Sequence, residues 1–425
     1  MTGIPQGSPA TQPVPLAGLR VVELGRFVAA PYAARLLGDL GADVVKVEGV
    51  AGDPFRTFVQ GRPGGLSSSF TALNRNKRCL AVDLSTELGR RAVADLLRRA
   101  DVFIENSRPG TMDKLGLGYE QVRADNARLV YCSISGFGET GPYVTRPGYD
   151  MIGQAVSGMA SQLLDPEAPQ VVGPNLADSI TGLTAAYSVL AAIHARATTG
   201  EGQRVSLNLV GSALAFLGTE AQRYLDTGAV PGHLTRPSNS LSFVLRCLDD
   251  RLLAIHLSSP PKFWTGLLDV IARQDLATDP RFDTHHHRQA HYLELREVLA
   301  PIIGQRTAAD WTAGLVAAGV PFALVNDMRQ VFEDEQVQAL GLLQTIGAGT
   351  GDEFATVGVP AQFSASPTEP MLPPPRLGEH SVQVLRALGY SARTVDAGIE
   401  SGCFLTASPA AGSTSAAPSV AVVNG

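Results

Sequence analysis

The sequence predicts an α/β fold, with a Rossmann-like large domain built on a parallel sheet and a smaller α+β domain. From Gly18 onward, short apolar runs typical of strands alternate with amphipathic stretches typical of helices. Such alternation is characteristic of a mostly parallel sheet covered by helices on both faces. The 425 residues are enough for two or three domains, and a second set of strand and helix patterns follows a loop-rich stretch at about 228–242.

The expected elements follow one another along the chain. The expected strands of the large domain are 19–24, 43–48, 79–84, 102–105, 129–134 and 204–210, and the helices between them include 31–40, 87–99 and 179–197. The smaller domain is expected to hold strands at 252–257 and 320–325, and helices that start near 260–264 or span 291–303 and 308–318. We therefore place the large domain at 16–225 and the small domain at 226–325.

The composition is that of an ordinary soluble globular protein, with 44% hydrophobic and 17% charged residues. A net charge of −6 gives no reason to expect nucleic acid as a partner. The four cysteines form no CxxC pair, so we expect neither a zinc site nor disulfides, and reduced thiols in the cytoplasm. No secretory signal is visible, and no run approaches the roughly 18 apolar residues of a membrane span. Residues 1–15 and 407–425 cannot bury enough apolar surface to pack, so we expect both to be disordered.

One carboxylate, Asp178, lies where a loop is expected to pass into the helix at 179–197. Asp is a favoured N-cap residue, because its oxygens accept hydrogen bonds from the unpaired amides of the first turn. The positive end of the helix dipole also favours an ionised carboxylate there. Two interpretations are open from this residue alone: a helix cap, or a charged nucleophile able to attack an activated acyl carbon.

Gly136, Gly138 and Gly141 match the dinucleotide-binding GxGxxG pattern and follow an expected strand. That pattern requires a helix to begin at the glycines, so that its N-terminus faces the pyrophosphate. Pro142 and Pro147 follow instead and predict a loop. An NAD-dependent oxidoreductase is therefore kept only as an alternative from another functional class.

Basic side chains are concentrated near the expected strand ends. The run Asn-Arg-Asn-Lys-Arg at 74–78 comes just before a strand, whereas Arg56 and Arg108 follow strands. Such a cluster is either a solvated turn or a cradle for a phosphate-bearing ligand. The loops that follow the strands of an open α/β sheet form its ligand-binding crevice. Three consecutive histidines at 285–287 cannot all face one metal ion, so we expect a solvated loop there and no metal site.

Eight short segments occur in a characteristic order along the chain. They are 18–24, 30–32, 40–48, 52–54, 74–78, 105–110, 200–203 and 377–380. Together they resemble the motifs of the family III CoA-transferases, which include formyl-CoA transferase, carnitine CoA-transferase and the 2-methylacyl-CoA racemases. The resemblance covers about residues 16–390.

The resemblance implies a reaction and a site. The family's nucleophilic aspartate falls on Asp178. It attacks the donor thioester to give an aspartyl anhydride and then an aspartyl-CoA thioester, from which an acceptor carboxylate takes up CoA. The implied CoA contacts are Arg56, Asn74, Arg75, Lys77, Arg78, Asn106, Arg108 and Lys114.

The resemblance also implies partners. The substrates are acyl-CoA and a small carboxylic acid, with no metal and no permanently bound cofactor, and neither nucleic acid nor a membrane is a partner. The resemblance implies that a segment at 326–395 returns to the Rossmann-like large domain, and that two chains interlock as a homodimer.

Departures from family members narrow the expected activity. The racemases have a histidine where this chain has Tyr149, whose phenol, with an ordinary pKa of about 10, is a poor base near neutrality. Racemisation is therefore the less favoured activity within the family. Formyl-CoA transferase has a glutamine where this chain has Val28, and a glycine-rich loop where this chain has 257–261, which disfavours oxalate as the acceptor.

The expected substrate-pocket residues are Val28, Phe137 and Tyr149. A dicarboxylate such as succinate is the expected CoA donor. A CoA-binding protein without catalytic activity is a further alternative.

Overall fold

The computed structural model describes residues 14–61, 65–258, 261–347, 353–366, 368 and 371–407. They form two compact units. The first unit comprises the described parts of Met1–Pro147, Asp178–Leu209 and Thr345–Gly425, and the second comprises those of Gly148–Ala177 and Val210–Gln344. Residues 148–177 and 210–225, which we expected in the large domain, thus belong to the second unit. Of the segment 326–395, residues 326–344 also belong to the second unit, and only its described residues from 345 onward belong to the first.

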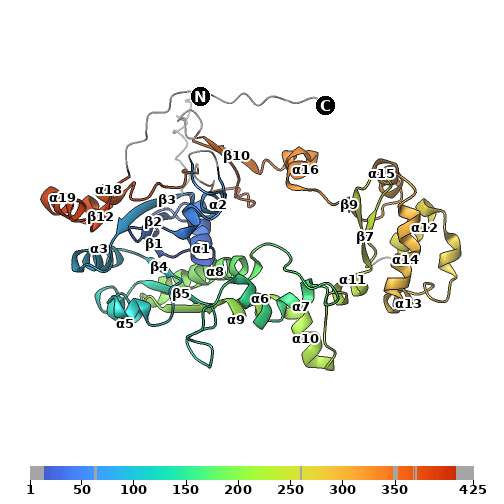
Figure 1. Cartoon of the computed structure of the whole chain (residues 1–425), viewed down its shortest axis with the longest axis horizontal. Helices are drawn as coiled ribbons and strands as arrows, with labels where there is room; N and C mark the ends of the chain where they lie inside the picture. The colour runs from blue at the N-terminus through green and yellow to red at the C-terminus, as the bar shows by residue number, and fades with distance from the viewer. Residues whose placement is uncertain are drawn as a thin grey trace, which may run out of the picture. The chain divides into compact units, whose positions relative to one another are not determined.

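A seven-stranded, mainly parallel sheet forms the centre of the first unit (Figure 1). Its strands are β1 (Arg20–Leu24), β2 (Asp43–Glu48), β3 (Lys77–Val82), β4 (Val102–Glu105), β5 (Val130–Ser135), β6 (Arg204–Asn208) and β12 (Phe404–Leu405). They are ordered β12-β3-β2-β1-β4-β5-β6, and only β12 is antiparallel to its neighbour. The expected α/β fold with a parallel sheet is confirmed.

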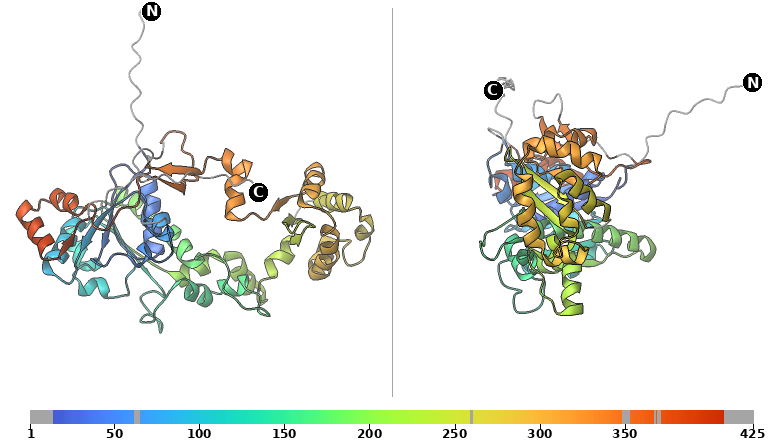
Figure 2. Two further views of the ribbon diagram at one scale, coloured as in Figure 1. Left: turned by 45° about the horizontal axis from the view of Figure 1, so that its top comes forward. Right: turned by 90° about the vertical axis from the view of Figure 1, so that its right-hand side faces the viewer.

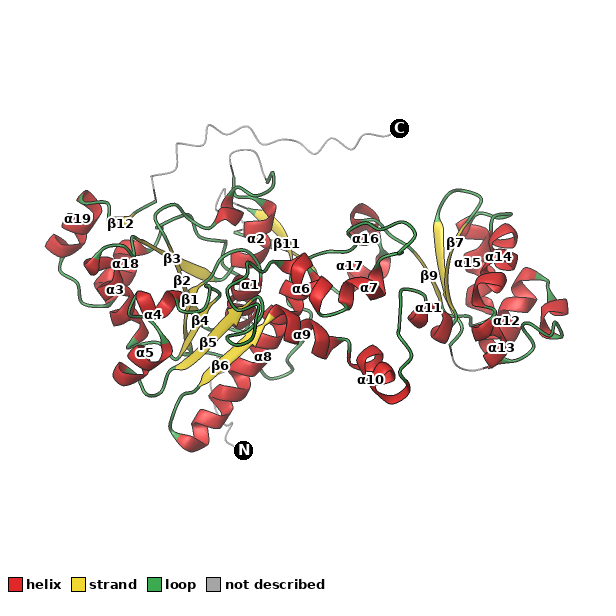
Figure 3. Cartoon of the chain, turned by 60° about the horizontal axis from the view of Figure 1, so that its bottom comes forward, coloured by secondary structure: helices red, strands yellow, loops and turns green. Residues whose placement is uncertain are grey.

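Helices cover both faces of this sheet, because its strands carry apolar side chains on both (Figure 3). The helices of the first unit are α1 (Ala29–Asp39), α2 (Ser68–Asn74), α3 (Glu87–Leu97), α4 (Thr111–Lys114), α5 (Tyr119–Asp125), α8 (Leu176–Thr199), α18 (Ser381–Ala387) and α19 (Ala392–Glu400), with the short 3₁₀ helix η1 (Pro54–Arg56). One buried cluster joins β1 to β5 with α3, α5, α18 and α19. Helix α1, with buried Ala30, Ala33, Ala34 and Leu37, packs on β1, β2 and β4.

The order of the strands determines where a ligand crevice lies. The chain proceeds from β1 to β2 and β3 on one side, then returns past β1 to β4, β5 and β6 on the other. In such open sheets ligands bind beyond the carboxyl ends of the strands at this switch point. Here the switch point lies between β1 and β4.

The C-terminal segment completes the first unit by returning to β3, where α18 and α19 lie beside the N-terminal strands (Figure 2). Cys79 N donates to His380 Nδ1 (3.2 Å), and Ala81 N donates to Ser381 Oγ (3.1 Å). Segment 377–380, the last of the family-like segments, therefore lies against the strand that follows the basic run 74–78.

The second unit holds a three-stranded antiparallel sheet of β7 (Ser242–Arg246), β8 (Leu252–His256) and β9 (Phe322–Leu324). Its other elements are α6 (Asp150–Val156), α7 (Met159–Leu163), α9 (Leu209–Phe216), α10 (Gly218–Thr227), α11 (Thr235–Ser240), α12 (Pro261–Ile271), η2 (Gln274–Ala277), α13 (His285–Ala290), α14 (Tyr292–Ile303), α15 (Ala308–Ala317), α16 (Met328–Glu333) and α17 (Glu335–Ala339). Trp311, Phe243 and Phe282 lie in the core that this sheet shares with α12, α14 and α15. Between the units in sequence, β10 (Leu343–Ile346) and β11 (Phe354–Val357) pair in a two-stranded sheet.

Three local expectations were wrong. Residues 285–287 begin helix α13 rather than forming a loop, because Thr284 caps it by accepting a hydrogen bond from His287 N (3.1 Å). Strand β3 begins at Lys77 rather than at residue 79, so part of the basic run is strand. Helix α8 begins at Leu176, which places Asp178 inside the first turn and not at the N-cap.

Helix α8 also changes the expectation about membrane spans. Its 24 residues are long and apolar enough to cross a membrane by length and composition, and 39% of its most apolar window is buried. The sequence prediction required an uninterrupted apolar run, which α8 lacks. The mean hydropathy of the helix is nevertheless high, because its Ser, Thr and Gly residues are scattered among apolar ones. A core helix of a soluble protein meets the same criterion.

Candidate active site

Asp178 lies in the first turn of α8 and is half-buried. The first-turn amides of a helix and its dipole both favour a negative side chain at this place. The preceding residues 173–175 form a bend that leads into the helix. The structure therefore keeps the carboxylate at a helix N-terminus, as the sequence predicted, but two residues inside the helix.

Gly182, one turn after Asp178, allows α8 to pack closely against the start of α1. A Cβ on Gly182 would lie 2.7 Å from Ala29 O and 3.0 Å from Tyr32 Cδ1, so only glycine allows this approach to the start of α1. Side chains four residues apart lie on the same face of a helix, about one turn from each other. Asp178 thus lies one turn before Gly182, on the side of α8 that faces α1.

The β1–α1 loop, residues Gly25–Val28, is held tightly at the switch point. Arg26 N donates to Asn106 Oδ1 (2.9 Å), and Asn106 Nδ2 donates to Arg26 O (2.8 Å), which ties the loop to the end of β4. A Cβ on Gly25 would lie 2.5 Å from Ala30 Cβ, so this position also requires glycine. No side chain caps α1, whose first residues are two alanines. The α1 N-terminus therefore offers backbone amides and a positive dipole end to a negatively charged group.

Two cavities open at the carboxyl edge of the sheet. One of about 300 Å³ lies beyond β1, β2 and β3 and is lined by 24–26, 47–53 and 82–85. The other, of about 70 Å³, lies beyond β4 and β5 and includes Glu105, Arg108, Glu139 and Arg204. Both occupy the place where open α/β sheets bind ligands.

Glu105 is the most perturbed acid in the smaller cavity. Burial raises its pKa to about 7, although Ser107 N donates a hydrogen bond to it (2.7 Å). Nearby Glu139 forms an ion pair with Arg204 and accepts a hydrogen bond from Ser133 Oγ (3.2 Å). Glu105 is not among the sequence-predicted site residues, although it ends the apolar run 102–105 and begins the family-like segment 105–110.

Glu105→Gln should change the pH dependence of stability. An acid whose pKa rises from 4.5 in the unfolded chain to about 7 in the native one destabilises the fold as pH rises between those values. The variant removes this ionisation, so relative to the wild type it should gain about 3 kcal/mol of unfolding free energy above pH 7 and little at pH 4.5. Urea unfolding at a series of pH values measures this, and a difference between the two proteins that is independent of pH would contradict the assignment.

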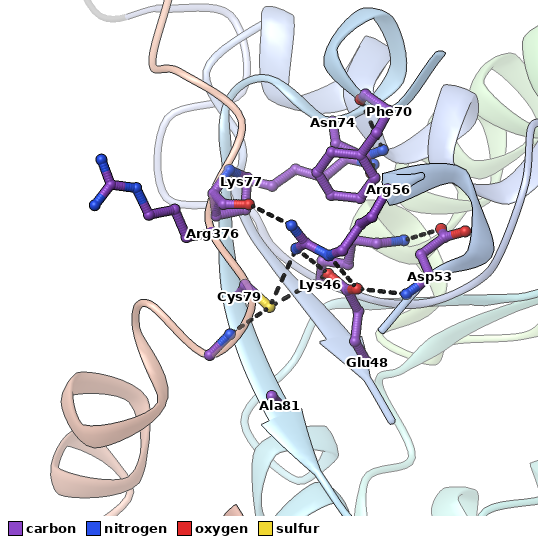
Figure 4. A network of polar contacts seen from close by, with 12 residues as sticks. Lys46, Glu48, Asp53, Arg56, Phe70, Asn74, Lys77, Cys79, Ala81 and Arg376 are labelled. Atoms are coloured by element: carbon purple, nitrogen blue, oxygen red, sulfur yellow. Dashed lines mark hydrogen bonds and ion pairs between the residues drawn. The ribbon is translucent and has the colours of Figure 1, made fainter. Parts of the chain in front are cut away.

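Charged side chains form a buried network in the first unit, and Figure 4 shows its members Lys46, Asp53 and Lys77. Lys46 Nζ is 3.0 Å from Glu23 Oε1 and 3.0 Å from Asp53 Oδ2; the second contact is an ion pair without hydrogen-bond alignment. Lys77 Nζ donates to Glu23 Oε2 (3.1 Å) and to Asn74 Oδ1 (2.8 Å). Burial lowers the pKa of Lys77 to about 8, opposed by the charge of Glu23.

Arg56 belongs to an adjoining part of the network. Its guanidinium pairs with Glu48 (Nη2 to Oε1, 2.7 Å), lies over the Phe70 ring, and donates to Pro375 O (3.1 Å). Burial alone raises the pKa of Glu48, but Arg56 and Lys46 together lower it to about 2. Burial and Glu48 raise the pKa of the Cys79 thiol to about 12, so Cys79 stays a thiol.

The structure separates the eight expected CoA contacts into two groups. Asn74, Arg75, Lys77 and Arg56 have buried or nearly buried side chains with protein partners; Arg75 pairs with Asp39 (2.7 Å). Arg78 pairs with Asp43 (2.7 Å), the first residue of β2, and so lies at the amino edge of the sheet. Residues that precede a parallel strand lie at its amino end, whereas the ligand crevice lies at the carboxyl ends of the strands. The basic run is therefore at the opposite edge of the sheet. CoA contact by these five side chains stays a prediction that now requires some of them to leave existing partners.

The other three expected contacts lie near the carboxyl end of β4. Asn106 bridges to the β1–α1 loop, and Arg108 and Lys114 are exposed. Arg108 also lines the smaller cavity. Arg108 and Lys114 are therefore the two expected contacts with exposed side chains, whereas the Asn106 side chain already bonds the β1–α1 loop.

The three expected substrate-pocket residues lie on three different segments of the chain. Val28 is buried against Phe55 and Phe70, next to the β1–α1 loop. Phe137 contacts the Tyr143 ring edge to face (5.6 Å) in the loop after β5. Tyr149, 61% exposed, precedes α6 in the second unit.

The dinucleotide alternative is not supported by the backbone. Strand β5 ends at Ser135, and residues 136–149 form turns and bends without a helix until α6. No helix therefore begins at the glycines to face a pyrophosphate.

The family model described as CoA-transferase family III matches residues 16–381. The chain belongs to the family III CoA-transferases. It is therefore an enzyme that transfers CoA, and its substrates are CoA thioesters.

Similar proteins agree with this assignment. A succinate–glutarate CoA-transferase of Agrobacterium fabrum is 35% identical over 93% of this chain and 99% of its own. The human succinyl-CoA:glutarate CoA-transferase is 31% identical over 93% of this chain and 90% of its own. Among solved structures, a CaiB/BaiF family protein from Brucella suis has a TM-score of 0.79 at 35% identity and covers 89% of this chain and all of its own.

Proposed function

We propose that this transferase moves CoA from an acyl-CoA to a free carboxylic acid through a covalent intermediate on Asp178. The supporting observation is the position of Asp178 in the first turn of α8, on the side packed against the start of α1 at the switch point of the sheet. The N-termini of α1 and α8 would then present positive dipole ends to the carboxylates, the thiolate and the oxyanions that form during the reaction.

The reaction needs no net proton transfer. A carboxylate oxygen of Asp178 attacks the thioester carbonyl, and the C–S bond breaks to give a mixed anhydride and CoA thiolate. The thiolate attacks the aspartyl carbonyl, which releases the donor acid and leaves an aspartyl-CoA thioester. The acceptor carboxylate then displaces the thiolate to form a second anhydride. Attack of the thiolate on the acyl carbonyl of that anhydride gives the new acyl-CoA and regenerates Asp178.

The acids exchanged are proposed to include dicarboxylates. The support is the naming of similar full-length proteins for succinate and glutarate. Racemisation is not proposed, because Tyr149 offers a phenol where that chemistry uses a histidine base. The test is a panel of acyl-CoA donors, beginning with succinyl-CoA, against glutarate and a series of mono- and dicarboxylates. Hydrolysis of the donors without formation of any new acyl-CoA would contradict CoA transfer between acids.

A homodimer of interlocked chains is also proposed. Helix α8 exposes Leu183 (55%) and Tyr187 (61%) on one face, one turn apart, and Phe216 and Leu225 are exposed on α9 and α10. A second copy of the chain is the proposed cover for these side chains. Because interlocked chains separate only with unfolding, sedimentation should give a dimer even at nanomolar concentration. A folded, active monomer would contradict it.

A further inference from the structure

We infer that a buried charge network positions the β1–α1 loop beside Asp178, an inference that rests on the proposed function. The clamp network consists of Glu23, Lys46, Asp53 and Lys77, all inside the first unit. Its members act through the backbone of the loop, so they are positioning residues for CoA transfer.

The loop has a conformation that the chain does not adopt without support. Phe27 has a φ of 63°, in the left-handed region that a bulky side chain rarely occupies. Backbone of this kind persists only where surrounding contacts over-determine it, and it occurs often at functional sites. The next residue, Val28, directly precedes α1.

The clamp network holds the backbone on both sides of Phe27. Gly25 N donates to Glu23 Oε1 (3.0 Å), and Lys46 Nζ donates to Gly25 O (2.9 Å). Phe27 N donates to Asp53 Oδ1 (3.3 Å). Lys77 Nζ donates to Pro31 O (2.8 Å) in the first turn of α1. Gly25, Phe27 and Pro31 are thus each bonded to a buried charged side chain.

Positioning of the loop accounts for these buried charges better than a contribution to stability does. Two acids and two lysines balance, and the side chains of Glu23, Lys46 and Lys77 are fully buried. Apolar residues in such places often give equal or greater stability, because they avoid desolvating ions. Apolar residues cannot, however, bond the peptide groups of Gly25 and Phe27. A role in fixing the loop accounts for the use of ions here.

The fixed loop lies where Asp178 needs a rigid partner. Gly182 packs directly on Ala29, so the position of α8 depends on the start of α1. A displacement of the loop shifts the surface that receives the thioester relative to the nucleophile. A misplacement of about 1 Å can lower a rate by about a hundredfold.

Asp53→Asn tests the inference, because asparagine retains an oxygen acceptor for Phe27 N but removes the charge that attracts Lys46. With succinyl-CoA as the donor, the rate of covalent adduct formation should fall about tenfold or more. The matched control is Arg20→Gln, which removes an exposed ion pair with Asp101 at the opposite edge of the sheet and should leave the rate unchanged. A variant that is less stable but forms the adduct at the wild-type rate would overturn the inference.

A second-site rescue separates positioning from general damage. Phe27→Gly and Phe27→Ala both remove the ring, but only glycine adopts a φ of 63° without strain. In the Asp53→Asn background, Phe27→Gly should therefore form the adduct faster than Phe27→Ala. Equal rates would overturn the inference. Absence of any adduct in the wild-type enzyme would instead count against the proposed function, so the two failures are distinguishable.

Discussion

Asp178→Ala should lower the rate of CoA transfer by at least about a thousandfold, because the variant has no group on which the intermediate can form. The side chain is half-buried at the start of α8, and the helix itself depends on the apolar residues that follow, so the variant should fold. Its Kd for CoA should change little, since Arg108 and Lys114, the exposed cations expected to contact CoA, lie on other elements. Initial rates with succinyl-CoA and a panel of acids measure the effect.

Asp165→Ala is a suitable control for that variant. Asp165 lies in an exposed turn, where it accepts a hydrogen bond from Glu167 N (2.9 Å), and it should retain wild-type activity. Comparable activity of Asp178→Ala and the wild type would exclude Asp178 as the nucleophile.

Lys46→Met should cause the largest loss of stability. Burial lowers the pKa of Lys46, but the charges of Glu23, Asp53 and Glu48 raise it by more than burial lowers it. The lysine is therefore charged in the native state. Methionine fills similar volume but leaves buried carboxylates without their cation. The expected loss in the free energy of unfolding is roughly 3–5 kcal/mol.

Urea unfolding of Lys46→Met and of Arg20→Gln provides the comparison. Arg20 also pairs with an acid, Asp101, but its side chain is 55% exposed, so its loss should cost less than about 1 kcal/mol. Equal losses in the free energy of unfolding for the two variants would show that burial does not determine how much the ion pairs of Lys46 contribute to stability.

The sequence allowed the main sheet to be predicted because its strands are short apolar runs of β-branched residues. Periodicity placed β1, β2 and β4 within about one residue of their observed bounds. Asp178 was selected as the candidate nucleophile by the family resemblance, and its place near a helix start was predicted from the loop that precedes it. Its position inside the first turn was not, because helix bounds depend on capping geometry that sequence patterns resolve poorly.

The phosphate cradle at 74–78 could not be judged from sequence. Cations next to a strand look alike whether they are solvated or buried, and only tertiary contacts show that Lys77 pairs with Glu23 and Arg75 with Asp39. The clamp network was missed for the same reason, since its members are separated by up to 54 residues. One available signal was a charged residue, Lys46, inside an otherwise apolar strand.

Trapping the aspartyl-CoA thioester on Asp178 is the most direct test of the proposed mechanism. The enzyme is mixed with succinyl-CoA, quenched with hydroxylamine, digested and analysed by mass spectrometry. A hydroxamate on the peptide that contains Asp178, formed at a rate that supports turnover and absent without donor, is the predicted result. Turnover with no modified aspartate, or with the hydroxamate on another acid, would contradict the account.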